Sequence, residues 1–220
     1  PTDVNRLWYK MFESWQAKRG RGGEGGIAVN AMGAVDIALW DIAGKARDLP
    51  IYDLLGGAVQ KEVMVYASTS RADRRHIVDP RGVWTSKTTE DMVIECKEYV
   101  AQGFKAIKYG WGKHFGPEAQ DSLAAIREAI GPDIRLMLDC GPGTYLDGGW
   151  TVKEAIRVAK MLDKYDIYFM EEPLHPYDVE GFRELTLNAP IKIATGESLT
   201  TLRDFQRFMD KKSIDVLQPD

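Results

Sequence analysis

The stretch "IYFMEEPL", from Ile167 to Leu174, places two acidic residues directly after an apolar run. Branched and aromatic side chains favour a β-strand, and Pro173 ends the pattern. Because side chains alternate between the two faces of a strand, only one of Glu171 and Glu172 can point to a given side. The residues alone leave open which carboxylate points into the space beyond the strand end.

The same pattern recurs from Lys61 to the end of the sequence. Short β-rich runs alternate with amphipathic segments, several of which follow a threonine capping signal. The expected strands are residues 63–69, 104–111, 134–140, 167–172, 191–197 and 214–220. The expected helices lie near residues 89–102, 117–130, 151–164, 178–187 and 200–211. This alternation predicts parallel strand pairing with right-handed crossovers, which is an α/β fold.

A (β/α)8-type barrel is favoured over an open sheet because polar residues stand at the carboxyl ends of successive strands. A closed barrel needs about eight strands, and the sequence offers six runs of this kind. We therefore expect residues 61–220 to form an incomplete (β/α) barrel, with C-terminal elements missing from this chain.

The first 60 residues show a different pattern. The segment "RGRGGEGG" (19–26) is typical of a flexible loop. Apolar residues then share one helical face, at Ala34, Val35, Ala38, Leu39, Ile42 and Ala46. Pro50 ends this helix, and Gly56-Gly57 ends a second short helical turn. Residues 1–60 are therefore expected to belong to a separate helical or α+β domain.

Composition excludes several classes of protein. The chain has 44% apolar and 28% charged residues, which is usual for a globular protein, and a net charge of -4 without a basic stripe argues against nucleic-acid binding. No apolar run reaches the roughly 18 residues of a membrane span, and the N-terminus has no signal-peptide layout. Cys96 and Cys140 do not make a disulfide framework, so we expect a cytoplasmic setting.

Acidic residues close several of the expected strands. Asp139, Glu171 and Glu197 end three of them, and Asp220 ends a fourth. In a parallel barrel these ends converge on one mouth, where carboxylates repel one another unless a positive charge is shared. A hard cation such as Mg²⁺ with oxygen ligands is the natural partner. The alternative is that these acids cap helices or pair with basic side chains at the rim.

The order of several motifs resembles a known family. The segments "AMGAVDIALWDIAGKARDLPIYDLLGG", "GFKAIKYG", "LMLDCG", "YFMEEPL", "IATGESL" and "LQPD" resemble motifs of the mandelate racemase/muconate lactonizing enzyme family of the enolase superfamily, closest to its acid-sugar dehydratases. The resemblance covers essentially the whole chain. It implies a capping domain followed by an enolase-type barrel, and it implies a homo-oligomer.

The resemblance also implies a site. Asp139, Glu171 and Glu197 match the Mg²⁺ ligands, which makes Glu171 the ligand of the two adjacent acids. Asp220 matches the aspartate that orients a catalytic histidine, which is expected beyond this chain. The implied reaction is Mg²⁺-dependent dehydration of a sugar acid: loss of the proton α to the carboxylate gives an enediolate, and loss of water gives a 2-keto-3-deoxy acid.

Two positions depart from the family pattern. The family's Lys-x-Lys base motif is represented by Lys108-Tyr109-Gly110, so Lys108 matches the first lysine and Gly110 stands where the base would be. Lys108 could add positive charge beside the substrate carboxylate, or it could be an ordinary rim lysine. Gly141 stands where the family usually has an asparagine, so substrate recognition there must differ.

Residues that could contact the polyol part of the substrate follow the first two strands. The segment 68–84 is long and basic, which suits either substrate recognition or a solvated charged loop. The candidates are Arg71, Arg74, Arg75 and His76 in this segment, then Trp111, Lys113 and His114, and finally Glu172, either as a rim or substrate-side contact or as the partner of a neighbouring basic group.

Two other functions stay open from the sequence. A racemase or epimerase of a 2-hydroxy acid is weakened by Gly110, because two-base racemisation needs an acid/base group on each face of the substrate. A non-catalytic relative that keeps the scaffold is the second alternative.

Overall fold

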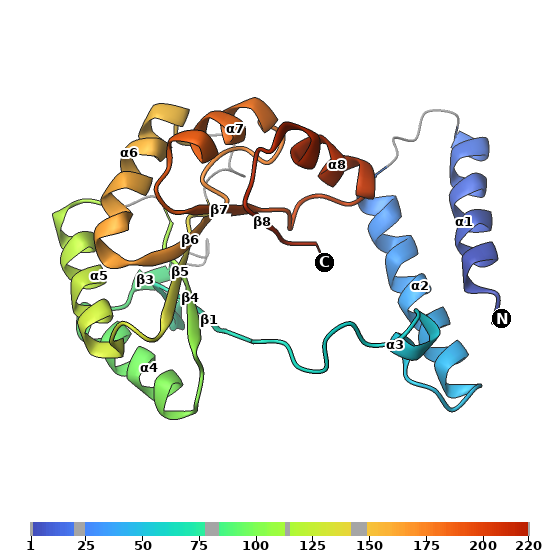
Figure 1. Ribbon diagram of the computed structural model, residues 1–220, viewed down its shortest axis with the longest axis horizontal. Helices are drawn as coiled ribbons and strands as arrows, with labels where there is room; N and C mark the ends of the chain where they lie inside the picture. Colours follow the sequence, from blue (N-terminus) through green and yellow to red (C-terminus); the bar gives the residue numbers. More distant parts are fainter. Residues whose placement is uncertain (1, 20–24, 78–83, 113–114, 142–148, 220) are drawn as a thin grey trace. The chain divides into compact units, whose positions relative to one another are not determined.

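The computed structural model describes the chain except for residues 1, 20–24, 78–83, 113–114, 142–148 and 220 (Figure 1). The chain divides into two compact units. The first comprises Pro1–Val63 with Leu199–Phe205 and Pro219–Asp220, and the second comprises Met64–Ser198 with Gln206–Gln218. The first division follows Val63, whereas the sequence led us to expect a boundary after residue 60, and two short later segments also belong to the first unit.

The first unit is helical where it is described. It contains α1 (Val4–Arg19), α2 (Ile27–Lys45) and the short α3 (Ile51–Leu54), and α1 packs beside α2. The second short turn is confirmed, and Pro50 lies directly before it in extended conformation, but the long helix already ends at Lys45 and not at Pro50. Helix α1 was not predicted from the sequence.

The apolar stripe that the sequence shows on α2 is not the stripe that is buried. Val35 and Ile42 are 47% and 44% exposed, whereas the buried residues of this helix include Val29, Met32 and Ala43. Apolar periodicity predicts that a helix has an apolar side, but the neighbouring element decides which residues of the helix are buried. Helix α1 supplies that neighbour, and the sequence pattern did not reveal it.

Helix α2 also corrects the expectation that no segment could span a membrane. By length and composition alone it is long and apolar enough to do so. Asp36 and Asp41 lie within it, and an aspartate near the middle of a bilayer costs about 2.5–3.5 kcal/mol. These two charges argue against a membrane span for α2, which packs beside α1 in the first unit.

The second unit contains a six-stranded parallel sheet, which confirms the predicted α/β fold. The strands are β1 (Ala67–Ser70), β4 (Ala106–Gly110), β5 (Arg135–Asp139), β6 (Ile167–Glu171), β7 (Lys192–Thr195) and β8 (Val216–Leu217), hydrogen-bonded in that order. The helices of this unit are α4 (Thr89–Ala101), α5 (Pro117–Ile130), α6 (Val152–Leu162) and α7 (Val179–Asn188), and α8 (Leu202–Lys211) is divided between the two units after Phe205. Each strand pairs with the next along the barrel order, as in a partial (β/α) barrel (Figure 1).

The face of the sheet opposite the helices carries one layer of side chains from four consecutive strands. Ala106, Met137, Phe169 and Ala194 form this buried cluster, with Tyr168 and Val216 packed against it. Layers built from neighbouring strands in this way are typical of a barrel interior.

The long basic segment after β1 is not a plain loop. It contains an antiparallel pair of strands, β2 (Ala72–Ile77) and β3 (Trp84–Ser86), which we call the β2–β3 hairpin. The sequence "ADRRHI" offers no apolar alternation, so its strand character comes from pairing with β3 rather than from its own residues.

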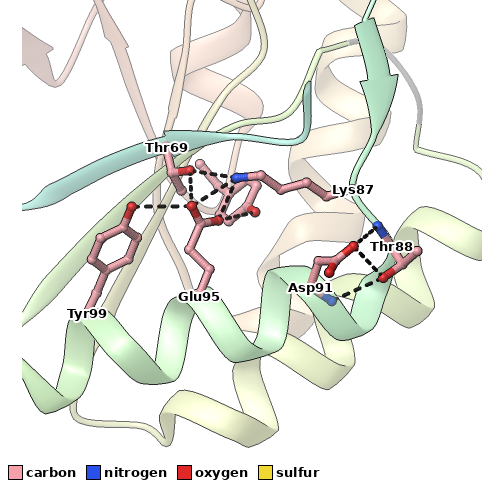
Figure 2. Close-up of polar contacts among 7 residues, drawn as sticks. Thr69, Lys87, Thr88, Asp91, Glu95 and Tyr99 are labelled. Carbon is pink, nitrogen blue, oxygen red and sulfur yellow. Dashed lines mark hydrogen bonds and ion pairs between the residues drawn. The ribbon is translucent and has the colours of Figure 1, made fainter. Parts of the chain in front are cut away.

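Threonine caps begin two helices, as the sequence predicted. The Thr88 hydroxyl accepts from the amide of Asp91, whose carboxylate bonds back to the Thr88 amide (Figure 2). Thr151 and Glu154 form the same reciprocal pair at α6. Each capping box satisfies amides that a helix start leaves unpaired.

Arg127 joins two turns of the second unit. Its guanidinium donates to the carbonyl oxygens of Tyr165 at 2.9 Å, Gly131 at 2.9 Å, Ile134 at 2.8 Å and Asp166 at 2.8 Å. Gly131 and Ile134 lie between α5 and β5, and Tyr165 and Asp166 lie between α6 and β6. One side chain therefore connects the two segments that precede β5 and β6.

Glu95 forms the polar contact between α4 and the sheet. Its carboxylate accepts from Lys87, at 2.8 and 2.9 Å, and from the hydroxyls of Thr69, Tyr99 and Tyr109 (Figure 2). Burial raises the pKa of Glu95, but Lys87 and the hydroxyl donors outweigh it, so the pKa lies below its ordinary value. Glu95 is therefore an anion in the folded protein at neutral pH.

Replacing Arg127 should destabilise the second unit. Arg127→Met leaves four carbonyl oxygens without their donor, so we expect the free energy of unfolding to fall by about 3 kcal/mol, measured by urea denaturation. The matched variant Arg183→Met removes an exposed arginine of α7 and should change it by less than about 0.5 kcal/mol. Equal effects of the two variants would contradict the role given to Arg127.

Glu95 should make stability depend on pH. Because its pKa is lower in the folded state than the ordinary value of about 4.3, its contribution is complete above that value and is lost as the pH falls through the folded pKa. We expect the free energy of unfolding to fall less steeply below about pH 4.5 in Glu95→Gln than in the wild type, measured by urea titrations at several pH values. Exposed Glu128→Gln is the control, and its pH profile should follow the wild type.

Candidate functional site

Three carboxylates stand at one edge of the sheet. Asp139 ends β5 and Glu171 ends β6, and the two residues are partners in the strand register. Glu197 lies two residues beyond the end of β7. Burial raises the pKa of Asp139, and the charges of Glu171 and Glu197 raise it further, while Lys108 and the Gly141 amide act in the opposite direction. The three acids therefore share one electrostatic environment.

Lys108 of β4 supplies the positive charge at this edge. Its ammonium lies 2.8 and 2.7 Å from the two oxygens of Glu171 and 3.8 Å from Asp139. The Lys108 side chain is 12% exposed and that of Glu171 is 1% exposed. Burial lowers the pKa of Lys108, but the two carboxylates outweigh it and hold the pKa above its ordinary value. Lys108 is thus a fixed cation between two carboxylates and not an ordinary rim lysine.

Glu171 and Glu172 have different surroundings. Glu171 faces Lys108, whereas Glu172 has a φ of 50° and a side chain that points toward β7. There it accepts hydrogen bonds from the Thr195 hydroxyl and from the Gly196 amide, the latter at 3.4 Å. Glu172 is 1% exposed, so the expected rim position is wrong. The left-handed backbone turns this side chain inward between two strands.

Thr195 is a residue that the sequence analysis missed. It lies 23 positions after Glu172 and meets it only because β6 and β7 are neighbours. The second oxygen of Glu172, Oε2, is buried and has no hydrogen-bond partner among the residues that the structure describes. The only sequence signal was a small hydroxyl residue at the end of a strand, which is too common to single out.

Gly110 is the residue that stands where the family has a base. It pairs with Ser70 of β1, and a Cβ atom at position 110 would lie 3.0 Å from the Ser70 Cβ and 3.2 Å from the Thr69 carbonyl oxygen. Contacts this short require β1 to move. The glycine is therefore a packing requirement of the β1–β4 pair.

Arg71 and Trp111 lie against each other after β1 and β4. The Arg71 guanidinium carbon is 4.7 Å from the centre of the Trp111 ring, and Phe115 stacks on Trp111 at 6.1 Å between ring centres. Trp111 is 3% exposed, so it supports Arg71 rather than offering a ring face to a ligand. The Arg71 Nε atom is buried and unpaired within the described part of the chain, which leaves a donor for a ligand oxygen.

Several expected site residues are not placed. Lys113, His114 and Asp220 lie outside the described residues, and Arg74, Arg75 and His76 lie on β2, whose side chains are not described. His175 is exposed and accepts a hydrogen bond from the Tyr177 amide at 3.3 Å.

The donor set at the sheet edge suits a hard divalent cation. Asp139, Glu171 and Glu197 offer only oxygen ligands, and carboxylates this close need a shared positive charge. Over the described residues, however, no three His, Cys, Asp or Glu side chains form a ready metal cluster. Lys108 occupies the position between Glu171 and Asp139, so a bound cation would share these carboxylates with the lysine.

Adding a side chain at position 110 should destabilise the protein, whereas the same change at an open glycine should stabilise it. Gly110→Ala should lower the free energy of unfolding by about 1–2 kcal/mol because its Cβ meets β1. The same change at Gly33 in α2, where a Cβ meets nothing within 4 Å, should raise it by about 0.5–1 kcal/mol. Thermal denaturation of both variants checks the pair, and a stabilised Gly110→Ala protein would contradict the packing argument.

Comparison with known proteins agrees with this architecture. Residues 91–220 match the family described as "Enolase C-terminal domain-like", and residues 1–56 match the "Mandelate racemase / muconate lactonizing enzyme, N-terminal domain". Among curated relatives, a D-gluconate dehydratase of Thermoproteus tenax is 31% identical over 88% of this chain and 37% of its own length. A D-galactarolactone cycloisomerase of Agrobacterium fabrum is 33% identical over 100% of this chain and 53% of its own length.

Solved structures of this family are also similar to this chain. A racemase from Streptomyces coelicolor, solved with bound magnesium, has a TM-score of 0.78 and 31% identity over 99% of this chain and 58% of its own. This chain spans about half the length of the relatives it matches, or less. The two matched domains together cover most of its residues. The chain belongs to the mandelate racemase/muconate lactonizing enzyme family of the enolase superfamily.

Proposed function

We propose that the protein carrying this chain is a Mg²⁺-dependent dehydratase of a sugar acid. The observation that supports this most directly is the cluster of Lys108, Glu171 and Asp139, with Glu197 nearby, at the carboxyl edge of the sheet. The similarity to a D-gluconate dehydratase supports the class of substrate. A carboxylate-bearing sugar suits a site of oxygen ligands with one fixed ammonium.

Asp139, Glu171 and Glu197 are the residues that would hold the cation. When bound, Mg²⁺ would neutralise the charge that develops on the substrate carboxylate as its α-proton leaves. Lys108 adds a second positive charge at the same edge and orients the substrate carboxylate. Because two carboxylates keep its ammonium protonated, Lys108 is assigned to charge stabilisation and not to proton abstraction.

The reaction breaks one C–H and one C–O bond. A base removes the proton from C2, the C2–C3 double bond forms, and the hydroxyl on C3 leaves as water after it takes a proton. The resulting enol takes a solvent proton at C3 and gives the 2-keto-3-deoxy acid. The resemblance implies a histidine oriented by Asp220 as the base, and the unpaired Arg71 Nε is proposed to donate to a substrate oxygen.

A cycloisomerase is the second candidate function. It is favoured by the D-galactarolactone cycloisomerase, which matches the whole of this chain. The two functions differ in mass balance, because dehydration removes one water from the substrate and cycloisomerisation leaves the mass unchanged. A racemase is less well supported, because the packing of Gly110 against Ser70 leaves position 110 without a side chain that could act as a second base.

The full-length protein should be tested on sugar acids, beginning with D-gluconate. We expect a product that is lighter by one water and, in D2O, carries deuterium at C3, as detected by mass spectrometry and NMR. Chelation should abolish turnover and Mg²⁺ should restore it. Glu197→Gln should lower kcat/KM by at least about 100-fold, because it removes one proposed ligand charge.

The exposed Glu184→Gln variant is the control for this experiment and should keep wild-type kinetics. Full activity of Glu197→Gln, or of the chelated protein, would contradict the proposed metal role. A product of unchanged mass would instead support the cycloisomerase.

A further inference from the structure

The two ends of the β2–β3 hairpin are fixed to each other and to β4. The Arg71 amide donates to the Gly110 carbonyl at 2.8 Å, and the Lys87 amide donates to the Arg71 carbonyl at 2.7 Å. The residue that enters the hairpin is therefore hydrogen-bonded to the residue that leaves it. Any movement of Lys87 acts directly on the backbone of Arg71.

The Lys87 side chain links this end of the β2–β3 hairpin to two other elements. Its ammonium lies 2.9 and 2.8 Å from the oxygens of Glu95 on α4 and 3.2 Å from the hydroxyl of Thr69 on β1 (Figure 2). Thr69 in turn donates to Glu95 at 2.9 Å. The lysine and glutamate side chains are 13% and 24% exposed, so the pair is largely shielded from water.

Contacts continue from this ion pair to the Arg71 guanidinium. The Tyr109 hydroxyl donates to Glu95 at 2.8 Å, and the Lys87 ammonium lies 5.7 Å from the centre of the Tyr109 ring. Tyr109 meets Trp111 edge to face at 6.0 Å between ring centres. Trp111 then supports Arg71 at 4.7 Å. Arg71 is thus linked to Lys87 by a backbone hydrogen bond, and to Glu95 through the contacts of Tyr109 and Trp111.

We propose that the Lys87–Glu95 ion pair is a positioning device for substrate binding, which holds Arg71 where its unpaired Nε can meet a substrate oxygen. This inference rests on the proposed function of the site. Neither Lys87 nor Glu95 is assigned a contact with substrate or metal. Both act through Arg71, so their loss weakens substrate binding and leaves the chemical step nearly unchanged.

The elements that the Lys87 and Glu95 hydrogen bonds join support a positioning role over simple stabilisation. A shielded ion pair often adds little net stability compared with apolar residues of similar size. Charge-assisted hydrogen bonds instead fix the relative orientation of the groups they join. Here they join β1, α4 and the end of the hairpin, where the Lys87 amide bonds to the backbone of Arg71.

A double-mutant cycle in the full-length enzyme tests the proposal. Arg71→Met should raise KM for the sugar acid about 30-fold, and Lys87→Met about tenfold, with kcat within about twofold of the wild type in each. The double variant should resemble Arg71→Met alone, because Lys87 acts only through Arg71. KM effects that multiply, or an unchanged KM in Lys87→Met, would overturn the proposal.

Two further variants separate positioning from folding. Lys87→Met with Glu95→Gln removes both charges, so no unpaired carboxylate remains, and it should keep the raised KM in a stably folded protein. Lys87→Arg preserves the charge and should recover most of the wild-type KM. The control Lys211→Met breaks an exposed ion pair with Glu180, 2.7 Å long in the structure, and should leave KM unchanged.

A measurement without turnover distinguishes failure of this proposal from failure of the proposed function. The Arg71 Nε–H resonance of ¹⁵N-labelled protein can be assigned by its absence in Arg71→Met. It should shift or broaden in Lys87→Met and stay unchanged in Lys211→Met. If it is unchanged in Lys87→Met, the positioning role is wrong, whatever reaction the enzyme catalyses.

Discussion

The ammonium of Lys108 between Glu171 and Asp139 is the interaction on which the polar edge of the sheet depends. Parallel pairing brings all strand ends to one edge, and adjacent strands lie only about 4.8 Å apart. Two acids in register on neighbouring strands must therefore repel each other unless a cation is near both. The same topology that builds the sheet thus creates the need for Lys108 and the oxygen-rich site suited to a metal.

Strand β4 connects this edge to the rest of the second unit through the alternation of its side chains. Lys108 points to the carboxylates, Tyr109 points to the opposite face and bonds to Glu95, and Gly110 allows β1 to pair closely. A single strand therefore links the charged edge, helix α4 and the base of the β2–β3 hairpin. This is why residues remote from the site, such as Glu95, bear on its geometry.

Local patterns were sufficient to predict the parallel sheet of the second unit and the helices between its strands. The six strands, the helices between them and the caps at Thr88 and Thr151 all follow from short-range periodicity and capping chemistry. Where structure depends on a partner element, the sequence was less informative. The pattern of α1 was not recognised as a helix, the strands of the β2–β3 hairpin form by pairing, and the covered stripe of α2 depends on its neighbour.

The sequence by itself determined the order of strands and helices, the acids at the strand ends, and the glycine at position 110. These are properties of neighbouring residues in the chain. Only the tertiary structure decided that Glu171 faces Lys108 while Glu172 turns inward to Thr195, that Trp111 is buried beneath Arg71, and that Lys87 meets Glu95. Each of these depends on a backbone angle or on a contact between separate elements, and neither is encoded by local periodicity.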